Sequence, residues 1–237
     1  AGTSVTTGQV EGLIQIQTGE RRCQKCGAVT FKSRCPDCGA HTEAVYRCPH
    51  CNQEGEPGQD SCPRCGANLV CSKESIISLA QEYAAALKNV GMSPSSAPEL
   101  KGVRGLISRE RVVEPMEKGL LRAKNTIFVF RDGTIRYDMI DLPLTHFRPA
   151  EVGVSVEKLR SIGYTKDMHG AELTDASQTA ELHPQDIMVS ADCGEYLVRV
   201  ARYIDELLES VYGQEAFYPV KTPVALVGRL VRGVAPD

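Results

Sequence analysis

Apolar residues recur at helical spacing in residues 73–90, and this stretch predicts a helix. Ser72 precedes it as a capping residue, and Gly91 follows it at the position where a left-handed residue often ends a helix. Such an apolar stripe indicates a helix that packs into a core. The stripe consists of Ile76, Leu79, Ala80, Tyr83, Leu87 and Val90.

A second helix is predicted over residues 193–212, where the apolar stripe is the strongest in the chain. Asp192 and Glu195 stand three residues apart, so they predict a capping box at its start. Gly213 marks its end. The stripe consists of Leu197, Val200, Ile204, Leu207, Leu208 and Val211.

Alternating or β-rich segments predict strands. Residues 126–130 and 134–138 flank Asp132 and Gly133, a dipeptide typical of a two-residue hairpin turn. Shorter elements are also predicted: strands at 12–17 and 182–190, a helix at 156–162 capped by Ser155 and ended by Gly163, a helix at 224–231, and a surface loop at 165–180.

These elements predict an α+β protein in three parts. The first part, residues 1–71, contains most of the cysteines, and residues 72–98 form a helix followed by a linker of the composition MSPSSAP. Residues 99–237 form a mixed helix and hairpin region. With 237 residues, the chain is long enough for one or two domains.

The net charge of -3 is distributed unevenly along the chain. Residues 21–38 carry five basic side chains against one acidic side chain, and residues 101–124 carry seven against three. Residues 165–215 carry eleven acidic against three basic side chains. A basic first half is compatible with a phosphate-rich partner, although solvated helix faces give the same pattern. No apolar run is long enough to predict a membrane span.

Four CxxC pairs lie within 43 residues, and this spacing is a strong metal-site signal. Two such turns present four thiolates, the ligand set of a closed tetrahedral Zn²⁺ site. Because all four positions are then occupied by protein, two structural zinc ions are expected. The eight ligands are Cys23, Cys26, Cys35, Cys38, Cys48, Cys51, Cys62 and Cys65.

The pairing of the CxxC turns is open between two arrangements. Sequential pairing joins the first turn to the second and the third to the fourth, which closes two short ribbons, whereas an interleaved pairing crosses them. A disulfide framework is the other alternative, but it needs an oxidising compartment, and no signal peptide is visible. We therefore expect a cytoplasmic protein in which Cys71 and Cys193 are reduced. His41 and His50 lie close to the cysteines, and His50, inside a CxxC, is expected to pack or contact solvent rather than bind metal.

A complete catalytic constellation is not found in the sequence. It has no GxxxxGK[ST], GxGxxG, HExxH or GxSxG motif. His146, His169 and His183 stand apart, and each is expected to have a structural role. Asp138 and Asp141 are three residues apart, but paired carboxylates without a third ligand are common on protein surfaces.

Several long strings in the second half resemble the large subunit of archaeal family D DNA polymerases, and the zinc block occupies the matching place before them. The resemblance covers residue 11 to the end. The strings are EKGLLRAKNTIFVFRDGTIRYD (117–138), PLTHFRPAEVGVSVEKLRSIGYTKD (143–167), ELHPQDIMVS (181–190) and YLVRVARYIDELLESVYG (196–213).

This resemblance implies a fragment of the polymerising subunit, whose core in that family consists of two double-psi β-barrels. The family's partners are primer-template DNA, a smaller subunit with a 3′–5′ exonuclease, and the sliding clamp. The resemblance further implies that the catalytic aspartates, which hold Mg²⁺, follow the GVAPD string (233–237), and that a lysine-bearing motif precedes residue 1. Asp237 departs from the family, which usually has His there. No catalytic residue is therefore assigned to this chain.

Eight basic side chains are candidates for contacts to DNA phosphates, with solvated surface or internal ion pairs as the alternative for each. A non-enzymatic zinc-ribbon adapter that binds nucleic acid or protein is the alternative function, and a zinc-stabilised oligomerisation module is a third. The candidates are Lys101, Arg104, Arg109, Arg111, Lys118, Arg122, Lys124 and Arg148.

Overall fold

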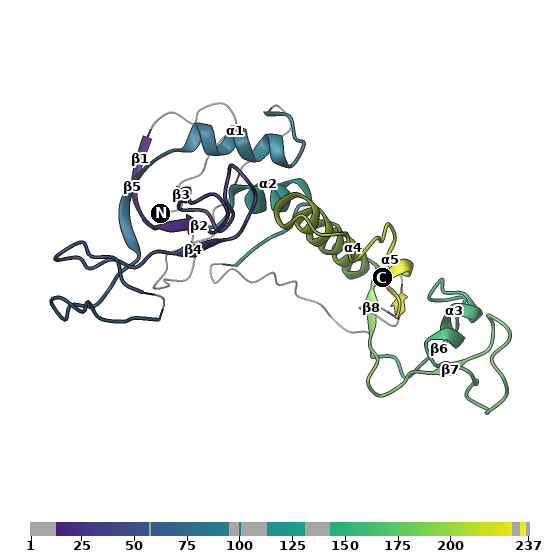
Figure 1. Ribbon diagram of the computed structural model, residues 1–237. Coiled ribbons are helices and arrows are strands. Elements are labelled where there is room, and N and C mark those ends of the chain that lie inside the picture. Colours follow the sequence, from purple (N-terminus) through teal and green to yellow (C-terminus); the bar gives the residue numbers. More distant parts are fainter. Residues whose placement is uncertain are drawn as a thin grey trace. The chain divides into compact units, whose positions relative to one another are not determined.

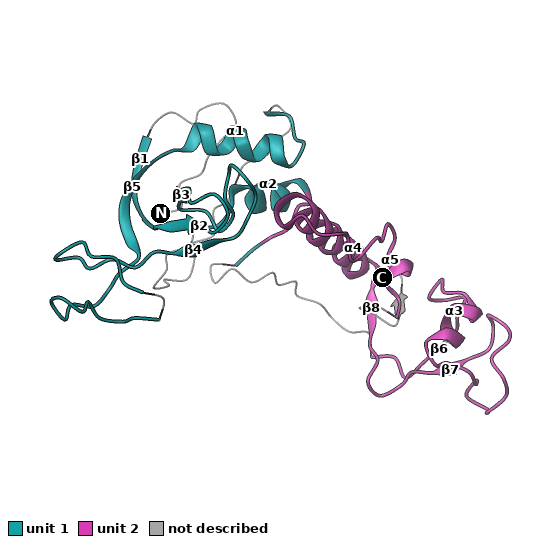
Figure 2. Cartoon of the chain, viewed as in Figure 1, with its two compact units in different colours: residues 1–124, 129–134 teal, residues 125–128, 135–237 magenta. Residues whose placement is uncertain are grey.

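The structure is a computed structural model that describes residues 13–56, 58–94, 100, 113–130, 143–228 and 233–235. The chain forms two compact units, shown in Figure 2. Unit 1 comprises residues 1–124 and 129–134, and unit 2 comprises residues 125–128 and 135–237. Both units mix helices and short strands, as expected for an α+β protein (Figure 1).

A two-stranded antiparallel sheet in unit 1 brackets the cysteine-rich region. Strand β1 (Leu13–Gly19) pairs with β5 (Ser72–Ser78), so that Leu13 lies opposite Ser78 and Gly19 opposite Ser72. The strand predicted at 12–17 is thereby confirmed. The helix predicted from residue 73 is wrong over its first turns, because that segment pairs with β1 instead.

Helix α1 (Leu79–Asn89) follows β5 directly, and its N-cap is Ser78, whose side chain accepts a hydrogen bond from the Gln81 backbone N–H. Its end at Gly91 was predicted correctly, since that glycine adopts a φ of 64°. Helix α2 (Met116–Lys124) packs against α1. Their shared core consists of Ala86, Leu87, Leu100 and Leu120, with Tyr83, Val90, Met92, Met116 and Ala123 around it.

The region between β1 and β5 contains a three-stranded sheet in the order β3-β2-β4. Strand β2 (Arg21–Cys23) lies at its centre, with β3 (Val29–Thr30) and β4 (Thr42–Ala44) on either side. Because β2 ends at Cys23, this sheet positions the first cysteine of the chain.

The described residues of unit 2 form two small two-stranded sheets. Strand β6 (His146–Phe147) pairs with β7 (Ala180–Glu181), and β8 (Met188–Ser190) pairs in parallel with β9 (Gly233–Ala235). The single strand predicted over 182–190 is therefore wrong in its first half, since only its last three residues form a strand.

The short helix α3 (Val156–Ser161) begins as predicted, because the Ser155 hydroxyl accepts a hydrogen bond from the Lys158 N–H. The last helix, α5 (Pro223–Leu226), is shorter than predicted. It ends where Val227 leaves the helical conformation and Gly228 adopts a φ of 79°.

Helix α4 (Ala191–Leu207) continues through a π-helical turn, η2 (Leu208–Tyr212), to Gly213, which has a φ of 60°. Its N-cap is Ser190, whose hydroxyl accepts a hydrogen bond from the Cys193 N–H, so the predicted capping box at Asp192 is wrong. The predicted apolar stripe is only half-buried. The buried positions of α4 are Cys193, Gly194, Tyr196, Val198, Ala201, Tyr203 and Asp205.

The core of unit 2 joins α3, α4, α5 and the segment between β6 and β8. Leu159, Leu173 and Leu226 are fully buried in it. Because Leu173 is fully buried, the sequence-based expectation that residues 165–180 form only a surface loop is wrong. The buried Asp205 of α4 accepts hydrogen bonds from the N–H groups of Phe217 and Tyr218, at 2.8 and 2.7 Å, which fixes the chain after η2.

Some expectations lie outside the described residues. The predicted turn at Asp132 and Gly133 and the second strand of that hairpin are among them. Its first strand, predicted over 126–130, is wrong, because residues 127–130 have irregular backbone and form no strand. The carboxylates Asp138 and Asp141 also lie outside. Within the described part of the chain, no helix has the length and apolar character that crossing a membrane requires.

Candidate metal centres and basic side chains

The structure brings the eight cysteines of the CxxC pairs together in two groups of four. In each group the sulfur atoms all lie within 4.8 Å of one another. The grouping follows the sequential arrangement, in which neighbouring CxxC turns share a site. Group 1 consists of Cys23, Cys26, Cys35 and Cys38, and group 2 of Cys48, Cys51, Cys62 and Cys65.

The sulfur separations suit a tetrahedral metal site and exclude disulfides. In group 1 the Sγ atoms of Cys23 and Cys38 are 3.4 Å apart, and those of Cys26 and Cys35 are 3.5 Å apart. In group 2 the Sγ atoms of Cys48 and Cys65 are 3.2 Å apart, and those of Cys51 and Cys62 are 3.5 Å apart. A disulfide needs about 2.05 Å, whereas four sulfurs about 2.3 Å from a zinc ion are about 3.8 Å from one another. The residues present therefore fit zinc.

Each CxxC turn repeats one backbone pattern. The N–H of the residue after the second cysteine donates to the carbonyl of the first cysteine, at 2.8 to 3.0 Å in all four turns. That donor residue has a positive φ in every case: 75° at Gly27, 70° at Gly39, 58° at Asn52 and 73° at Gly66. Glycine stands after the second cysteine in three of the turns, and Asn52 occupies the same left-handed position in the third turn.

Asn52 provides a test of this pattern, because asparagine tolerates the left-handed conformation and β-branched residues do not. We expect Asn52→Gly to leave the zinc affinity of group 2 unchanged, and Asn52→Val to destabilise that turn by about 1–3 kcal/mol. Competition with a chromophoric chelator measures this. Equal zinc affinity in the two variants would contradict the assigned role of the backbone.

Burial and charge show what a bound cation would do in each group. The first cysteine of every turn is buried: Cys23, Cys35, Cys48 and Cys62. The backbone N–H of Cys26 lowers the pKa of Cys23 to about 6. The Ala28 N–H lowers the pKa of Cys26, but the sulfurs of Cys23 and Cys35 outweigh it and raise that pKa to about 12.

Group 2 follows the same pattern. Burial raises the pKa of Cys48, but the N–H of Cys51 and other donors lower it to about 6. The Ala67 N–H lowers the pKa of Cys65, and the Cys48 sulfur reverses this and raises it to about 12. In group 2 the pKa of Cys62 is lowered as well: burial raises it, but the N–H groups of Arg64 and Cys65 outweigh this. In each group at least one thiolate thus forms readily, and its charge disfavours the ionisation of neighbouring thiols. A divalent cation removes that repulsion and permits four thiolates together.

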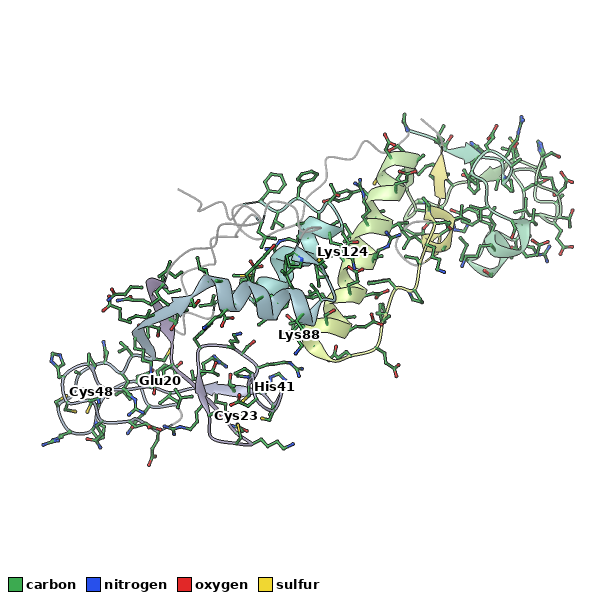
Figure 3. The ribbon with its side chains drawn as sticks, turned by 90° about the horizontal axis from the view of Figure 1, so that it is seen from above. Glu20, Cys23, His41, Cys48, Lys88 and Lys124 are labelled. Carbon is green, nitrogen blue, oxygen red and sulfur yellow. The ribbon has the colours of Figure 1, made fainter. Side chains whose placement is uncertain are left out.

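Neither of the remaining cysteines, nor any histidine among the described residues, joins these groups. Cys71 and Cys193 are both buried, and neither is in a disulfide with another described cysteine. His41 and His50 are exposed beside the two groups and are not ligands. Figure 3 labels Cys23 and Cys48, which belong to group 1 and group 2 respectively.

The candidate phosphate contacts are in different environments. Lys124 and Arg148 are exposed, and Lys118 is half-buried on α2. Arg122 is buried and forms a two-pronged ion pair with Glu114, at 2.6 and 2.9 Å. That position favours a structural role for Arg122. Lys101, Arg104, Arg109 and Arg111 lie outside the described residues.

Most of the basic side chains in residues 21–38 bind within unit 1. Arg21 donates to Thr42, Arg22 pairs with Glu54, Lys32 pairs with Glu82, and Arg34 donates to the Gly39 carbonyl. Most of these basic side chains therefore form contacts within unit 1, so fewer of them are available to bind phosphates.

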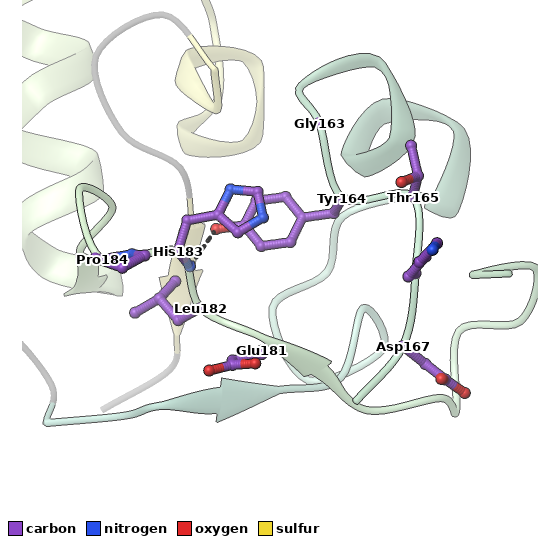
Figure 4. A pocket seen from close by; sticks show the side chains of 9 residues that line it. Gly163, Tyr164, Thr165, Asp167, Glu181, Leu182, His183 and Pro184 are labelled. Atoms are coloured by element: carbon purple, nitrogen blue, oxygen red, sulfur yellow. Dashed lines mark hydrogen bonds between the residues drawn. The ribbon is translucent and has the colours of Figure 1, made fainter. Parts of the chain in front are cut away.

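A pocket of about 390 Å³ opens in unit 2 beside His183, as shown in Figure 4. The imidazole of His183 stacks on Tyr164 with the ring centroids 4.2 Å apart. The Tyr164 hydroxyl donates to the buried Asp186 at 2.6 Å. These contacts give His183 a structural role, while His146 and His169 are exposed elsewhere in the unit.

Comparison with known families identifies two matches. The profile of the DNA polymerase II large subunit DP2, catalytic domain, matches residues 93–237. The profile of the central domain of the same subunit matches residues 2–57.

Individual relatives agree with these matches. The chain is 87% identical over 235 residues to the DNA polymerase II large subunit of Methanocorpusculum labreanum, covering 99% of this chain and 21% of that relative. It is 56% identical over 225 residues to the protein of the same name from Methanoculleus marisnigri, covering 95% of this chain and 17% of that relative. The Pyrococcus furiosus protein is 44% identical over 232 residues, covering 95% of this chain and 18% of that relative. The chain thus spans about a fifth of the length of these relatives.

Proposed function

Because this chain belongs to the family of DNA polymerase II large subunits, we propose that it is a segment of the polymerising subunit of a replicative DNA polymerase. In this proposal it supplies two structural zinc modules and a scaffold that faces DNA during templated nucleotidyl transfer. The observation that supports it most is the identity of 87% over almost the whole chain. An isolated zinc-ribbon adapter is not expected to contain the region 93–237, which matches the catalytic-domain profile.

The zinc sites have a structural role in this proposal. Each group offers four thiolates, so a bound ion has no open position for a substrate. Phosphoryl transfer instead needs Mg²⁺ held by carboxylates and cations that bind the phosphates. The printed sequence has no Asn- and Asp-rich run of the NCDGDED type. We therefore place the Mg²⁺ site in the complete subunit outside these residues, on a core of two double-psi β-barrels.

The organisation and partners are part of the same proposal. Residues 1–71 form the tandem zinc-ribbon region, 72–98 the connection, and 99–237 a segment of the catalytic core. The proposed partners are primer-template DNA, the small exonuclease subunit and the sliding clamp. A cytoplasmic setting, in which thiols stay reduced and available to zinc, is part of the same proposal.

DNA binding by this chain tests the proposed scaffold role. We expect it to bind primer-template DNA with little sequence preference, and with an affinity whose logarithm falls by about 0.9 per phosphate contact for each tenfold rise in salt. Lys124→Gln and Arg148→Gln are each expected to reduce that slope by about 1. Lys25→Gln is the matched control, because Lys25 is an exposed lysine outside the candidate set.

The same experiment includes an activity measurement. The zinc-loaded chain is expected to show no Mg²⁺-dependent extension of a labelled primer, because it lacks the aspartate motif. Incorporation of nucleotides by this chain alone would contradict the proposed division of roles. A salt slope unchanged in both variants would remove Lys124 and Arg148 from the DNA contacts.

A further inference from the structure

Residues 21–44, with group 1, form the first cysteine ribbon, and residues 45–71, with group 2, form the second. Glu20 lies where both ribbons meet the β1–β5 sheet. It separates β1 from β2, and Figure 3 labels it together with Cys23 and Cys48. Its backbone N–H donates to the Cys71 carbonyl at 2.7 Å, and its carbonyl accepts from the Val45 N–H at 2.9 Å. The backbone of Glu20 therefore contacts the segments that follow both cysteine groups.

The side chain of Glu20 is only 10% exposed and contacts two cations. One carboxylate oxygen is 3.2 Å from Arg47 Nε, and the other is 2.6 Å from Lys73 Nζ. Burial raises the pKa of this carboxyl, but Lys73 and Arg47 outweigh it and hold the pKa below its usual value. A buried carboxylate without these partners would be strongly disfavoured.

Arg47 extends the contacts toward the first ribbon. Its Nη2 is 3.1 Å from Glu54, and Arg22 forms a two-pronged pair with the same carboxylate at 2.7 and 2.9 Å. Arg22 immediately precedes Cys23, and Arg47 immediately precedes Cys48. The charges alternate in sign along this path, so each interior member has an opposite charge on both sides. We call the set Lys73, Glu20, Arg47, Glu54 and Arg22 the Glu20 network.

We propose that the Glu20 network positions the two zinc ribbons relative to each other, so that they move as one rigid body. The backbone of each ribbon is closed by its own hydrogen bonds and its own four cysteines, so neither needs the network to bind metal. What the network adds is a path of ion pairs between the residues that precede the two groups. The network crosses between the ribbons at two places, where the buried Glu20 pairs with Arg47 and where Glu54 pairs with Arg22, so removing either carboxylate breaks it.

The test measures orientation separately from metal binding. Residual dipolar couplings of the backbone N–H groups are recorded on the zinc-loaded 237-residue chain and on Glu20→Gln, together with zinc content. In the unmodified chain, one alignment tensor is expected to fit both ribbons. In Glu20→Gln, each ribbon is expected to fit its own tensor, while zinc content stays at two ions per chain.

Glu43→Gln is the matched control, because it removes the same charge from an exposed position of β4, in the sheet whose central strand β2 begins one residue after Glu20. It is expected to retain the single tensor. A single tensor in Glu20→Gln would overturn the proposal, and so would loss of zinc from either ribbon. If Glu20→Gln does not fold, Glu54→Gln carries the test, since Glu54 is 39% exposed and pairs with both arginines. A single tensor in that variant would then overturn the proposal.

Discussion

Replacing Cys23 or Cys62 by serine is expected to remove one zinc ion per chain and to unfold the ribbon that contained it. Each residue is a buried member of a different group of four sulfurs. Serine does not supply a thiolate, and three thiolates bind zinc far more weakly than four. Because structural zinc contributes on the order of 10 kcal/mol of apparent free energy to small metal-bound folds, the ribbon without its ion does not hold its turns.

Zinc content and the amide spectrum of each ribbon measure this result. Cys23→Ser is expected to lose the signals of residues 21–44 and keep those of residues 45–71, and Cys62→Ser is expected to do the reverse. Cys193→Ser is the control, because Cys193 is a buried thiol of unit 2 outside both groups. Loss of both ions from either single change would mean that the sites are interleaved or that their binding is coupled.

Leu173→Ala is expected to destabilise unit 2 by about 2–5 kcal/mol, the cost of deleting a fully buried leucine side chain and leaving a cavity. Leu173 is 0% exposed in the main core of the unit, and its carbonyl accepts a hydrogen bond from Arg160 at 3.0 Å. Hydrogen exchange of residues 143–227 reports the opening of this unit separately from unit 1.

Met168→Ala is the matched control for this substitution. Met168 belongs to the same loop but is 49% exposed, so its truncation is expected to change the opening free energy by less than about 0.5 kcal/mol. Equal effects of the two substitutions would contradict the burial of Leu173.

The cysteine ribbons could be predicted from sequence because a CxxC turn is a local structure. Both cysteines, the turn between them and the residue after them lie within five positions, and one site needs only two such turns. Asn52 occupies the position that glycine holds in the other three turns, since asparagine also adopts a positive φ. The third turn, Cys48–Cys51, can be predicted to share the pattern once the left-handed position is sought rather than the residue type.

Elements that depend on distant pairing could not be predicted in the same way. Residues 72–78 carry Ile76 and Ile77 in a pattern that is compatible with a helix, but β1, more than 50 residues earlier, pairs with them as a strand. Leu173 is one apolar residue in a polar stretch, and only the tertiary fold shows that it is buried. The contacts of Glu20 likewise join residues 27 and 53 positions away.

The start of α4 shows a competition between two local signals. Asp192 and Glu195 match the capping-box spacing, but Ser190 is also a strong capping residue and lies at the end of β8. The strand positions Ser190 where the chain turns into the helix, so the helix is capped two residues before the predicted position. The sequence contained both signals, and the preceding strand decided between them.

Native mass spectrometry of the zinc-loaded chain, with a thiol titration in denaturant, tests the central claim of two closed zinc sites with four cysteine ligands each. We expect two zinc ions per chain in the native spectrum and ten titratable thiols after denaturation, one for each cysteine of the sequence. A chain without zinc, with fewer thiols and a mass reduced by disulfide formation, would contradict both the metal sites and their assigned structural role.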